Sequence, residues 1–251
     1  MFGLESYDQL LSEKVDMTCI HKASFRYDPY HSGMDPISCF GDKSNFFKDK
    51  CALLFISVGQ AYHEGSKFLS TIRLVNNYKF KSCDIVMADT LQRHNFLNFS
   101  PEQAQIYTRK AGDCWLKRNE IALEEFSHNY SIIRWDDLLS HENYFMLRKK
   151  IESEYKKNIE YEQAIRSNVE AYLERLKNTN PGVETGLLVD SGFKYLIEEL
   201  PIVMPLWAEM GYDFIIYPKP ITPAMKKTYD LFVHDNFQSK CRWIYLRFKK
   251  R

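Results

Sequence analysis

Short apolar runs alternate with longer amphipathic stretches along this chain. The apolar runs have strand length and are rich in β-branched or aromatic residues, which predicts strands over 18–25, 52–58, 84–88, 130–135, 214–217 and 243–248. Between these runs, apolar residues recur at helical spacing, which predicts helices over 67–78, 101–126, 144–177 (in one or two pieces), 191–200 and 223–235. Strands therefore alternate with helices along most of the sequence.

This alternation is typical of an α/β fold whose mainly parallel sheet is flanked by helices. The runs Ala-Leu-Leu-Phe-Ile and Phe-Ile-Ile-Tyr are apolar on both faces, as strands covered on both sides require. No internal repeat, low-complexity tract or Ser/Gly-rich linker divides the chain, so we expect residues 1–251 to form a single Rossmann-like domain. Ligands bind at the carboxyl ends of such strands, which directs attention to 57–62, Asp89 and 217–220.

Composition narrows the class of protein without identifying a function. The 251 residues are 45% hydrophobic and 27% charged, enough apolar material for one sizeable core, which excludes disorder as the main state. The 34 Lys and Arg residues nearly balance the 33 Asp and Glu residues, and the formal charge of +1 provides no global attraction for polyanions. A nucleic acid would therefore have to bind a local basic patch.

The sequence gives no indication of export, membrane insertion or metal binding. Its six cysteines are scattered, with no C-x-x-C pair and no suitably spaced histidine, so we expect reduced thiols, no metal and no cofactor. The first residues are acidic where a signal peptide is basic, and no apolar run reaches the roughly 18–20 residues of a transmembrane helix. These features predict a cytoplasmic protein with no membrane partner.

One candidate nucleophile stands out at a strand end. Ser57 closes the second predicted strand and precedes Gly59 in a turn, although a lone serine at such a place more often caps a helix or stabilises a turn. The elbow of serine hydrolases requires G-x-S-x-G, but Phe55 occupies the position of the first glycine. No Asp and His follow at a spacing that suggests a catalytic relay, which argues against a hydrolase.

Two later segments carry polar groups beside apolar stretches. Tyr195 and Glu199 lie four residues apart on a short helix that ends at Pro201, so a phenol and a carboxylate share one edge and could jointly hold an amine. A solvated surface pair is the commoner role for such residues. The strand over 214–217 ends in Tyr217 followed by a proline, which places a second tyrosine at the expected binding edge.

Taken together, these segments resemble the cyclodipeptide synthases, a family that makes cyclic dipeptides from two aminoacyl-tRNAs. The family motifs are Ser-x-Gly-x-x-Tyr, then Tyr-x-x-x-Glu followed by Pro, then a second catalytic tyrosine. Their matches in chain order are Ser57, Gly59 and Tyr62, then Tyr195, Glu199 and Pro201, and finally Tyr217. The resemblance spans 52–218, about two thirds of the chain. It implies a fold similar to the catalytic domain of class I tyrosyl- and tryptophanyl-tRNA synthetases.

The resemblance also indicates a branch of the family. One branch has Asn three residues after the serine, whereas the other has a variable residue there and Pro after the second tyrosine. Gln60 and the Tyr217-Pro218 pair match the second branch. Phe55 is a departure, because many members have a small residue two positions before the serine.

The resemblance implies a ping-pong mechanism with aminoacyl-Ser57 and dipeptidyl-Ser57 intermediates, in which Tyr195, Glu199 and Tyr217 are also catalytic. An aminoacyl-tRNA is already an activated ester, so transfer to Ser57 needs no ATP and little activation of the hydroxyl. A carboxylate suits the next step, because an α-amino group with a pKa near 8 is mostly protonated at neutral pH. The sequence contains no phosphate-binding G-x-x-x-x-G-K-[ST] loop and no element like the nucleotide signatures of the synthetases.

The resemblance further implies which residues bind the substrates. The substrate pocket would be lined by Leu53, Phe55, Gly59, Gln60, Tyr62, Val86, Ile202 and Ile215. Because Phe55 is bulky, we expect a small or short aliphatic first residue such as Ala or Gly. The family uses a basic helix for tRNA, and the matching candidates are Arg109, Lys110, Lys117 and Arg118.

Several alternatives are compatible with the same residues. The four basic residues could form a merely solvated helix face, and the basic stretch over 240–251 could either add tRNA affinity or protect an edge strand from aggregation. The whole chain could be a noncatalytic Rossmann-like module that binds tRNA or a nucleotide, or a serine acyltransferase or hydrolase with an oxyanion site at the Gly59 turn. The family resemblance favours a monomer with two aminoacyl-tRNA substrates.

Overall fold

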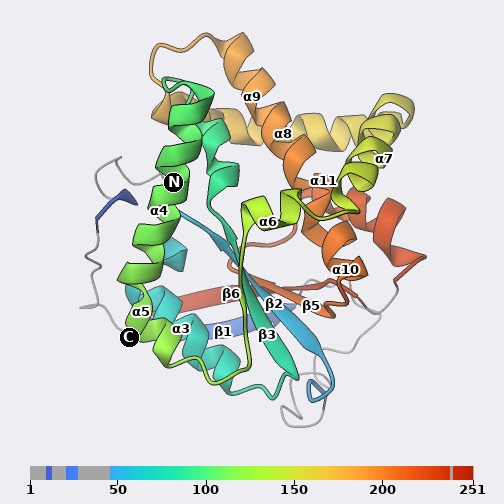
Figure 1. Cartoon of the computed structure of the whole chain (residues 1–251). Coiled ribbons are helices and arrows are strands. Elements are labelled where there is room, and N and C mark those ends of the chain that lie inside the picture. Colours follow the sequence, from blue (N-terminus) through green and yellow to red (C-terminus); the bar gives the residue numbers. More distant parts are fainter. Residues whose placement is uncertain (1–9, 13–20, 28–45, 238–239, 251) are drawn as a thin grey trace.

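The computed structural model describes residues 10–12, 21–27, 46–237 and 240–250, and a twisted six-stranded sheet runs through its centre (Figure 1). The strand order is β1-β6-β5-β2-β3-β4. The strands are β1 (His21–Tyr27), β2 (Cys51–Ser57), β3 (Ser82–Ala88), β4 (Ile132–Arg134), β5 (Phe214–Tyr217) and β6 (Arg242–Lys250). All six predicted strands are present, and the predicted residues 18–20 of the first lie outside the described residues.

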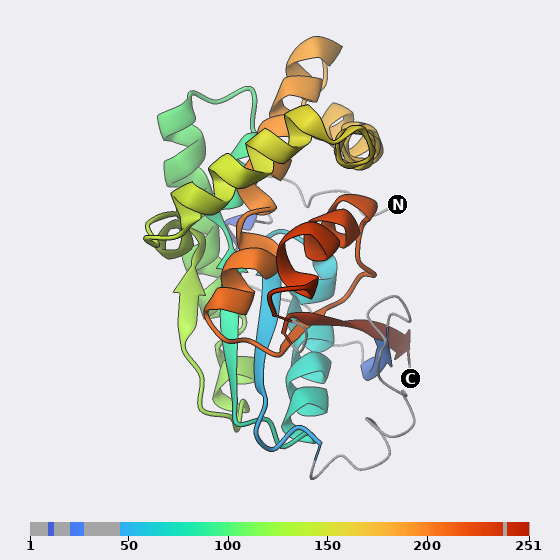
Figure 2. The ribbon, with the colours of Figure 1, turned by 90° about the vertical axis from the view of Figure 1, so that its right-hand side faces the viewer.

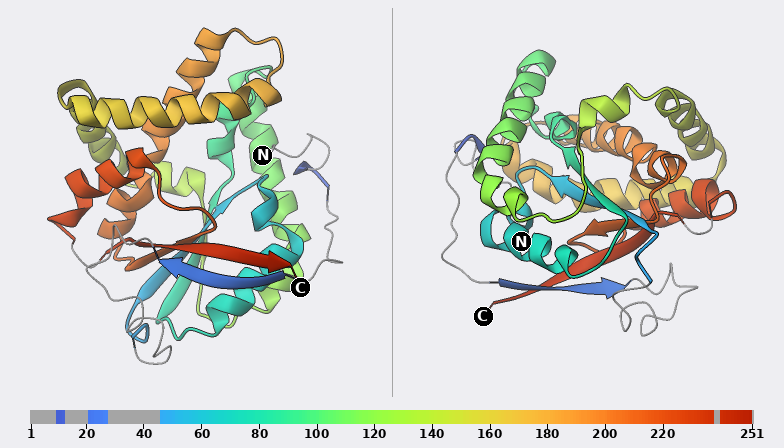
Figure 3. Two further views of the ribbon diagram at one scale, coloured as in Figure 1. Left: turned by 180° about the vertical axis from the view of Figure 1, so that it is seen from behind. Right: turned by 60° about the horizontal axis from the view of Figure 1, so that its bottom comes forward.

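The sheet is mainly parallel, as the sequence predicts. β2 pairs in parallel with β3 on one side and β5 on the other, and β4 and β6 extend the sheet in parallel. Only β1 among the six strands runs antiparallel, beside β6 at the sheet edge, where Figure 3 shows the two strands side by side. The carboxyl ends of β2, β3 and β5 consequently meet at one edge of the sheet.

Side chains alternate between two cores because successive strand residues point to opposite faces. Along β2, Leu53 and Phe55 join the core on one face, whereas Leu54 and Ile56 join the core on the other. All four are almost fully buried. A central strand covered on both faces explains why its sequence is apolar without interruption.

Helices cover both faces of the sheet. On one face lie α3 (Gly65–Asn76), α4 (Pro101–Arg118) and α5 (Glu120–Glu124). On the other lie α6 (Trp135–Leu139), α7 (Tyr144–Lys157), α8 (Ile159–Thr179), α9 (Thr185–Glu199), α10 (Trp207–Glu209) and α11 (Pro223–Tyr229). Short helical turns are η2 (Ala61–His63), η3 (Thr90–Asn95), η4 (Ile202–Leu206) and η5 (Asp230–His234). Figure 2 shows α7, α8 and α9 gathered beyond one end of the strands.

The predicted helices are present with shifted ends. The predicted helix over 101–126 is divided into α4 and α5 at Asn119, and the one over 144–177 into α7 and α8 at Asn158. The prediction over 191–200 found only the second half of α9. The sequence pattern also missed η3, α6, η4 and α10, which are too short to show a helical period.

No helix within the described ranges is both long and apolar enough to span a membrane. The four cysteines that the structure describes, Cys51, Cys83, Cys114 and Cys241, are free thiols, and Cys19 and Cys39 lie outside the described residues. Nor does the described part of the chain contain a group of three or more His, Cys, Asp or Glu side chains arranged to hold a metal ion.

Candidate active site

Three hydroxyl groups form a chain at the carboxyl ends of β2 and β5. The hydroxyl of Tyr217 lies 3.1 Å from Ser57 Oγ and 2.9 Å from the hydroxyl of Tyr62. Ser57 is the last residue of β2, and Tyr217 is the last residue of the neighbouring β5. The chain turns directly after Ser57 through Gly59, whose φ of 85° favours glycine, and returns Tyr62 to the same place.

A small cavity of about 40 Å³ opens at these hydroxyls. On this measure one water occupies roughly 10–15 Å³, so the cavity has room for a few non-hydrogen atoms. Its walls come from β2, η2, η3, α8, α9 and β5, and they are Ser57, Gln60, Tyr62, Gln92, Asn95, Tyr172, Leu176, Tyr195 and Tyr217. The fold thus brings together Ser57, Gln60, Tyr62, Tyr195 and Tyr217, as expected from the sequence.

Four cavity residues were missed at the sequence level: Gln92, Asn95, Tyr172 and Leu176. Gln92 and Asn95 follow β3, and the rule that ligands bind at strand ends could have found them beside Asp89. Tyr172 and Leu176 lie one turn apart on α8, far from any strand end, and only their helical spacing was visible in the sequence.

Glu199 is buried one helical turn beyond Tyr195 on α9, so both side chains share one edge of the helix. Glu199 is not among the described residues that line the cavity. The Oε1 atom of its neighbour Glu198 accepts a hydrogen bond of 2.9 Å from Trp135 Nε1. The other carboxylate oxygen of Glu198 contacts Arg93 and lies 3.1 Å from His94 Nε2.

The Glu198 carboxylate therefore ties α9 to η3. Burial opposes its ionisation, but hydrogen bonding and charge from His94 and Arg93 outweigh burial and lower the pKa of Glu198. The two walls that carry Tyr195 and Asn95 are held against each other by this contact.

The ring of Phe55 lies directly behind Tyr217. Its centroid is 5.2 Å from that of Tyr217 and 5.0 Å from that of Trp207, and it also stacks on Trp135. Four aliphatic residues are also expected in the substrate pocket, and all are fully buried in the same core as Phe55: Leu53, Val86, Ile202 and Ile215. None of these five lines the cavity described above, so their contact with substrate stays a prediction.

His63 is completely buried against this cluster, with its ring centroid 4.7 Å from that of Tyr62 and 5.5 Å from that of Tyr217. Burial lowers the pKa of His63 to about 3, so the imidazole is neutral at physiological pH. Its Nε2 atom has no hydrogen-bond partner among the described residues, and the ring packs on the two tyrosines.

The four basic candidates on α4 differ in exposure. Arg109, Lys110 and Lys117 are exposed, but Arg118 is buried. Its guanidinium makes two bonds to the Glu64 carboxylate, of 2.8 and 3.2 Å, and donates to the backbone carbonyls of two residues near the N-terminus. The burial of Arg118 argues against the predicted contact with tRNA. The sequence shows that this residue is charged but does not show that it is buried.

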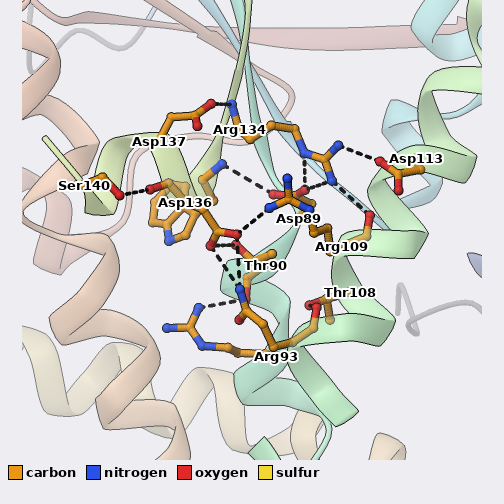
Figure 4. Close-up of polar contacts among 12 residues, drawn as sticks. Asp89, Thr90, Arg93, Thr108, Arg109, Asp113, Arg134, Asp136, Asp137 and Ser140 are labelled. Atoms are coloured by element: carbon orange, nitrogen blue, oxygen red, sulfur yellow. Dashed lines mark hydrogen bonds and ion pairs between the residues drawn. The ribbon is translucent and has the colours of Figure 1, made fainter. Parts of the chain in front are cut away.

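A polar network fastens α4 to the sheet (Figure 4). The guanidinium of Arg134 at the end of β4 contacts Asp89 after β3 and donates to Asp113 of α4 at 2.7 Å. Burial raises the pKa of Asp89, and the charge of Arg134 opposes that shift. Arg109 donates to Asp136 of α6 at 3.1 Å. Asp89 thus has a structural role, and the charge of Arg109 is partly neutralised.

A second basic surface lies beside the hydroxyl chain, in a groove lined by His21, Tyr62, Lys67, Pro218, Lys219, Leu246, Arg247 and Phe248. Lys219 Nζ lies 5.6 Å from the centroid of the Tyr62 ring. Within the described residues, neither Lys67 nor Arg247 forms an ion pair with an acidic side chain. The groove as a whole was not predicted, because Lys67, Lys219 and Arg247 come from three separate segments. Arg247 belongs to the stretch 240–251, for which added tRNA affinity was one of two predicted roles.

The fold has counterparts among solved structures, although no protein-family model and no curated protein matches the chain. A cyclodipeptide synthase from Fluoribacter dumoffii is 33% identical, with a TM-score of 0.83, and the alignment covers 93% of this chain and 100% of that one. The chain belongs to the cyclodipeptide synthase family.

More distant structures share the fold of this synthase. A cyclodipeptide synthase from Candidatus Glomeribacter gigasporarum, bound to Phe-tRNAPhe, is 23% identical over 79% of this chain and 88% of its own, with a TM-score of 0.66. A Mycobacterium tuberculosis protein described as related to type I tRNA synthetases is 13% identical over 82% of this chain and 87% of its own, with a TM-score of 0.58. The predicted fold class of the synthase is confirmed.

Proposed function

We propose that this synthase joins the aminoacyl groups of two aminoacyl-tRNAs into a cyclic dipeptide, with Ser57 as the covalent nucleophile. The observation that supports this most directly is the hydroxyl chain from Ser57 through Tyr217 to Tyr62 at the mouth of a cavity. Membership of the family supports the substrate class. The Ser57 hydroxyl lies at a strand end, where a bound ester can reach it.

In the first step, Ser57 Oγ attacks the ester carbonyl of one aminoacyl-tRNA. A new ester bond forms to Ser57, the bond to the terminal ribose breaks, and the proton of Ser57 ends on the ribose oxygen. Because one ester replaces another, no ATP is consumed. Tyr217, 3.1 Å from Ser57 Oγ, orients the hydroxyl and supports the proton transfer.

In the second step, the amine of the Ser57-bound aminoacyl group attacks the ester carbonyl of the second aminoacyl-tRNA. An amide bond forms, the ester bond to the second ribose breaks with its tRNA as the leaving group, and a dipeptidyl ester remains on Ser57. Tyr195 lines the cavity and can hold the amine, and the family resemblance assigns the acceptance of its proton to Glu199, one turn further on α9. In the last step, the second amine attacks the seryl ester, the ring closes and Ser57 is released. Tyr217 returns the proton to Ser57 Oγ in this proposal, and the 3.1 Å contact between the two hydroxyls supports that role.

The tRNA binds two basic surfaces, the groove beside Tyr62 and the exposed basic residues of α4. The groove beside Tyr62 carries Lys67, Lys219 and Arg247, and no acidic residue lines it in the part of the chain that the structure describes. On α4, Lys110 and Lys117 are exposed, while Arg109 already contacts Asp136. The groove therefore provides the stronger local attraction for phosphates, which a formal net charge of only +1 makes necessary.

Sequence and cavity size together favour finer features of this function. The pair Tyr217-Pro218 together with Gln60 favours the branch with a variable residue in place of Asn. Phe55 and the small cavity favour a small first residue such as Ala or Gly. We infer that residues 1–251 act as one catalytic domain, as a monomer without metal or cofactor, in the cytoplasm where charged tRNAs occur.

Expression of the chain in a bacterial host tests this function. Mass spectrometry of the culture medium should show diketopiperazine masses that are absent when the Ser57→Ala variant is expressed at the same level. Purified enzyme is also assayed with charged tRNAs from a second host, so that substrates absent from the expression host are tested. Equal amounts of product from wild type and Ser57→Ala would contradict the proposal.

A further inference from the structure

Asn95 brings to the cavity wall a buried amide acceptor that no described protein group satisfies. Asn95 is 2% exposed, lines the cavity, and among the described residues its Oδ1 atom has no hydrogen-bond partner. Buried polar groups almost always have a partner, and an acceptor left without one is destabilising. Because Asn95 itself lines the cavity, a donor that arrives with the substrate can satisfy this acceptor.

Neighbouring amides fix which atom Asn95 presents. Gln92 donates through Nε2 to the backbone carbonyl of Ala88 at 3.2 Å. Its Oε1 atom therefore points away from Ala88 and acts as an acceptor. Asn95 donates through Nδ2 to that Oε1 atom at 2.7 Å. The carbonyl of Ala88 can only accept, so the order of donors and acceptors is determined along the whole chain. Within the described residues Asn95 thus uses Nδ2 as a donor to Gln92, and Oδ1 is its acceptor without a partner.

Asn95 also lies next to the wall that carries Tyr195. Ser191 of α9 donates to the backbone carbonyl of His94 at 2.5 Å, and the rings of His94 and Tyr195 are 6.3 Å apart between centroids. Asn95 follows His94 in the chain, and Tyr195 lies one turn after Ser191. Asn95 and Tyr195 thus lie on adjoining walls of one cavity.

We propose that Asn95 Oδ1 accepts a hydrogen bond from the α-amino group of the aminoacyl substrate. This inference rests on the function proposed above and adds a substrate-binding residue to it. The α-amino group is present on every aminoacyl-tRNA, whereas a side-chain donor is present on only some. A neutral amide accepts from an ammonium group and from a free amine alike, so it keeps the nitrogen in place after a proton has left.

That property distinguishes Asn95 from Glu199. A carboxylate stabilises the charged ammonium and resists its deprotonation, although it can accept the proton. An uncharged acceptor orients the nitrogen without holding the proton on it. Asn95 and Gln92 together therefore form a rigid amide pair that positions the nucleophilic nitrogen for attack.

The test compares two substrates in single-turnover acylation of Ser57, followed by intact-protein mass spectrometry. One is the aminoacyl-tRNA that gives product with wild type, and the other is the same tRNA carrying the acid without its amino group, which is propionyl-tRNA for an alanyl substrate. The Asn95→Leu variant removes the acceptor and keeps a similar volume. Asn95→Ala serves as a second variant if Asn95→Leu unfolds.

The proposal predicts that either variant lowers the acylation efficiency with aminoacyl-tRNA by about ten- to hundredfold. The same variants should leave acylation by the desamino substrate unchanged relative to wild type. A general folding defect would instead lower both by the same factor, and that result, or no loss with either substrate, would overturn the proposal. A wild type that forms no adduct with any charged tRNA would instead refute the function on which the inference rests.

Discussion

Replacement of Phe55 by alanine connects the packing of the core with the choice of substrate. The Phe55 ring is 1% exposed and lies between Tyr217, Trp207 and Trp135. Removing it takes away the ring that supports Tyr217 from behind. We therefore expect the Phe55→Ala variant to leave space against Tyr217 and to widen the pocket for the first aminoacyl group.

The energetic cost follows from the contacts. Replacing a buried Phe by Ala costs about 3–5 kcal/mol, and aromatic pairs add about 0.5–1.5 kcal/mol each beyond the buried area. With Tyr217 and Trp207 both in close ring contact, we expect a loss near the upper end, about 4–5 kcal/mol. Phe55→Leu retains most of the volume and should lose less than half as much.

Two measurements decide the outcome. Urea unfolding gives the loss of stability for Phe55→Leu and Phe55→Ala, and product analysis with a mixture of charged tRNAs gives the substrate range. We expect Phe55→Ala to accept larger first residues than wild type, with Phe55→Leu between them. An unchanged product spectrum in a folded Phe55→Ala variant would refute the view that this ring limits the first aminoacyl group.

Three further predictions concern the same region. Tyr217→Phe removes the hydroxyl that contacts Ser57, so the rate of product formation should fall about a hundredfold or more. The free energy of unfolding in urea should change by only about 1 kcal/mol. An undiminished rate would exclude a role of Tyr217 in proton transfer. His63 has a pKa of about 3 in the folded state, below its unfolded value of 6.5, so stability is lost as the pH falls below about 6.5. At pH 5 the loss from this group should be about 2 kcal/mol by thermal or urea unfolding, and His63→Phe should remove that part of the pH dependence. Arg118→Met leaves the buried Glu64 carboxylate without its charged partner and should cost about 3–5 kcal/mol in urea unfolding, while the folded fraction binds tRNA as wild type does. A stable variant with weak tRNA binding would instead support a direct contact between Arg118 and tRNA.

The strands and the central site could be predicted because each depends on local signals. A run such as 52–56 is apolar at every position only when both faces are covered, and Ser57 and Tyr217 stand where such runs end. Parallel pairing of β2 with β5 then brings their last residues together. The hydroxyl chain follows from strand order, and the motif spacing supplies Tyr62.

Other parts of the site depend on contacts that sequence patterns do not contain. Asn95 and Gln92 lie on a short turn with no period, and their importance appears only through the amide chain to Ala88. Arg118 looks like its exposed neighbours in the sequence, but helical rotation turns it toward Glu64. Tyr172 reaches the cavity because α8 crosses the end of the sheet, which is a property of the tertiary packing.

Ser57 carries the aminoacyl group in the proposed mechanism, and every later step depends on that ester. The most direct measurement is peptide-level mass spectrometry of the enzyme, acid-quenched within the first turnover after mixing with one charged tRNA. We predict an aminoacyl ester on the peptide that contains Ser57, absent from Ser57→Ala and present in a Glu199→Gln variant that is blocked at the later step. An adduct on another residue, or cyclic dipeptide formation by Ser57→Ala, would contradict the mechanism.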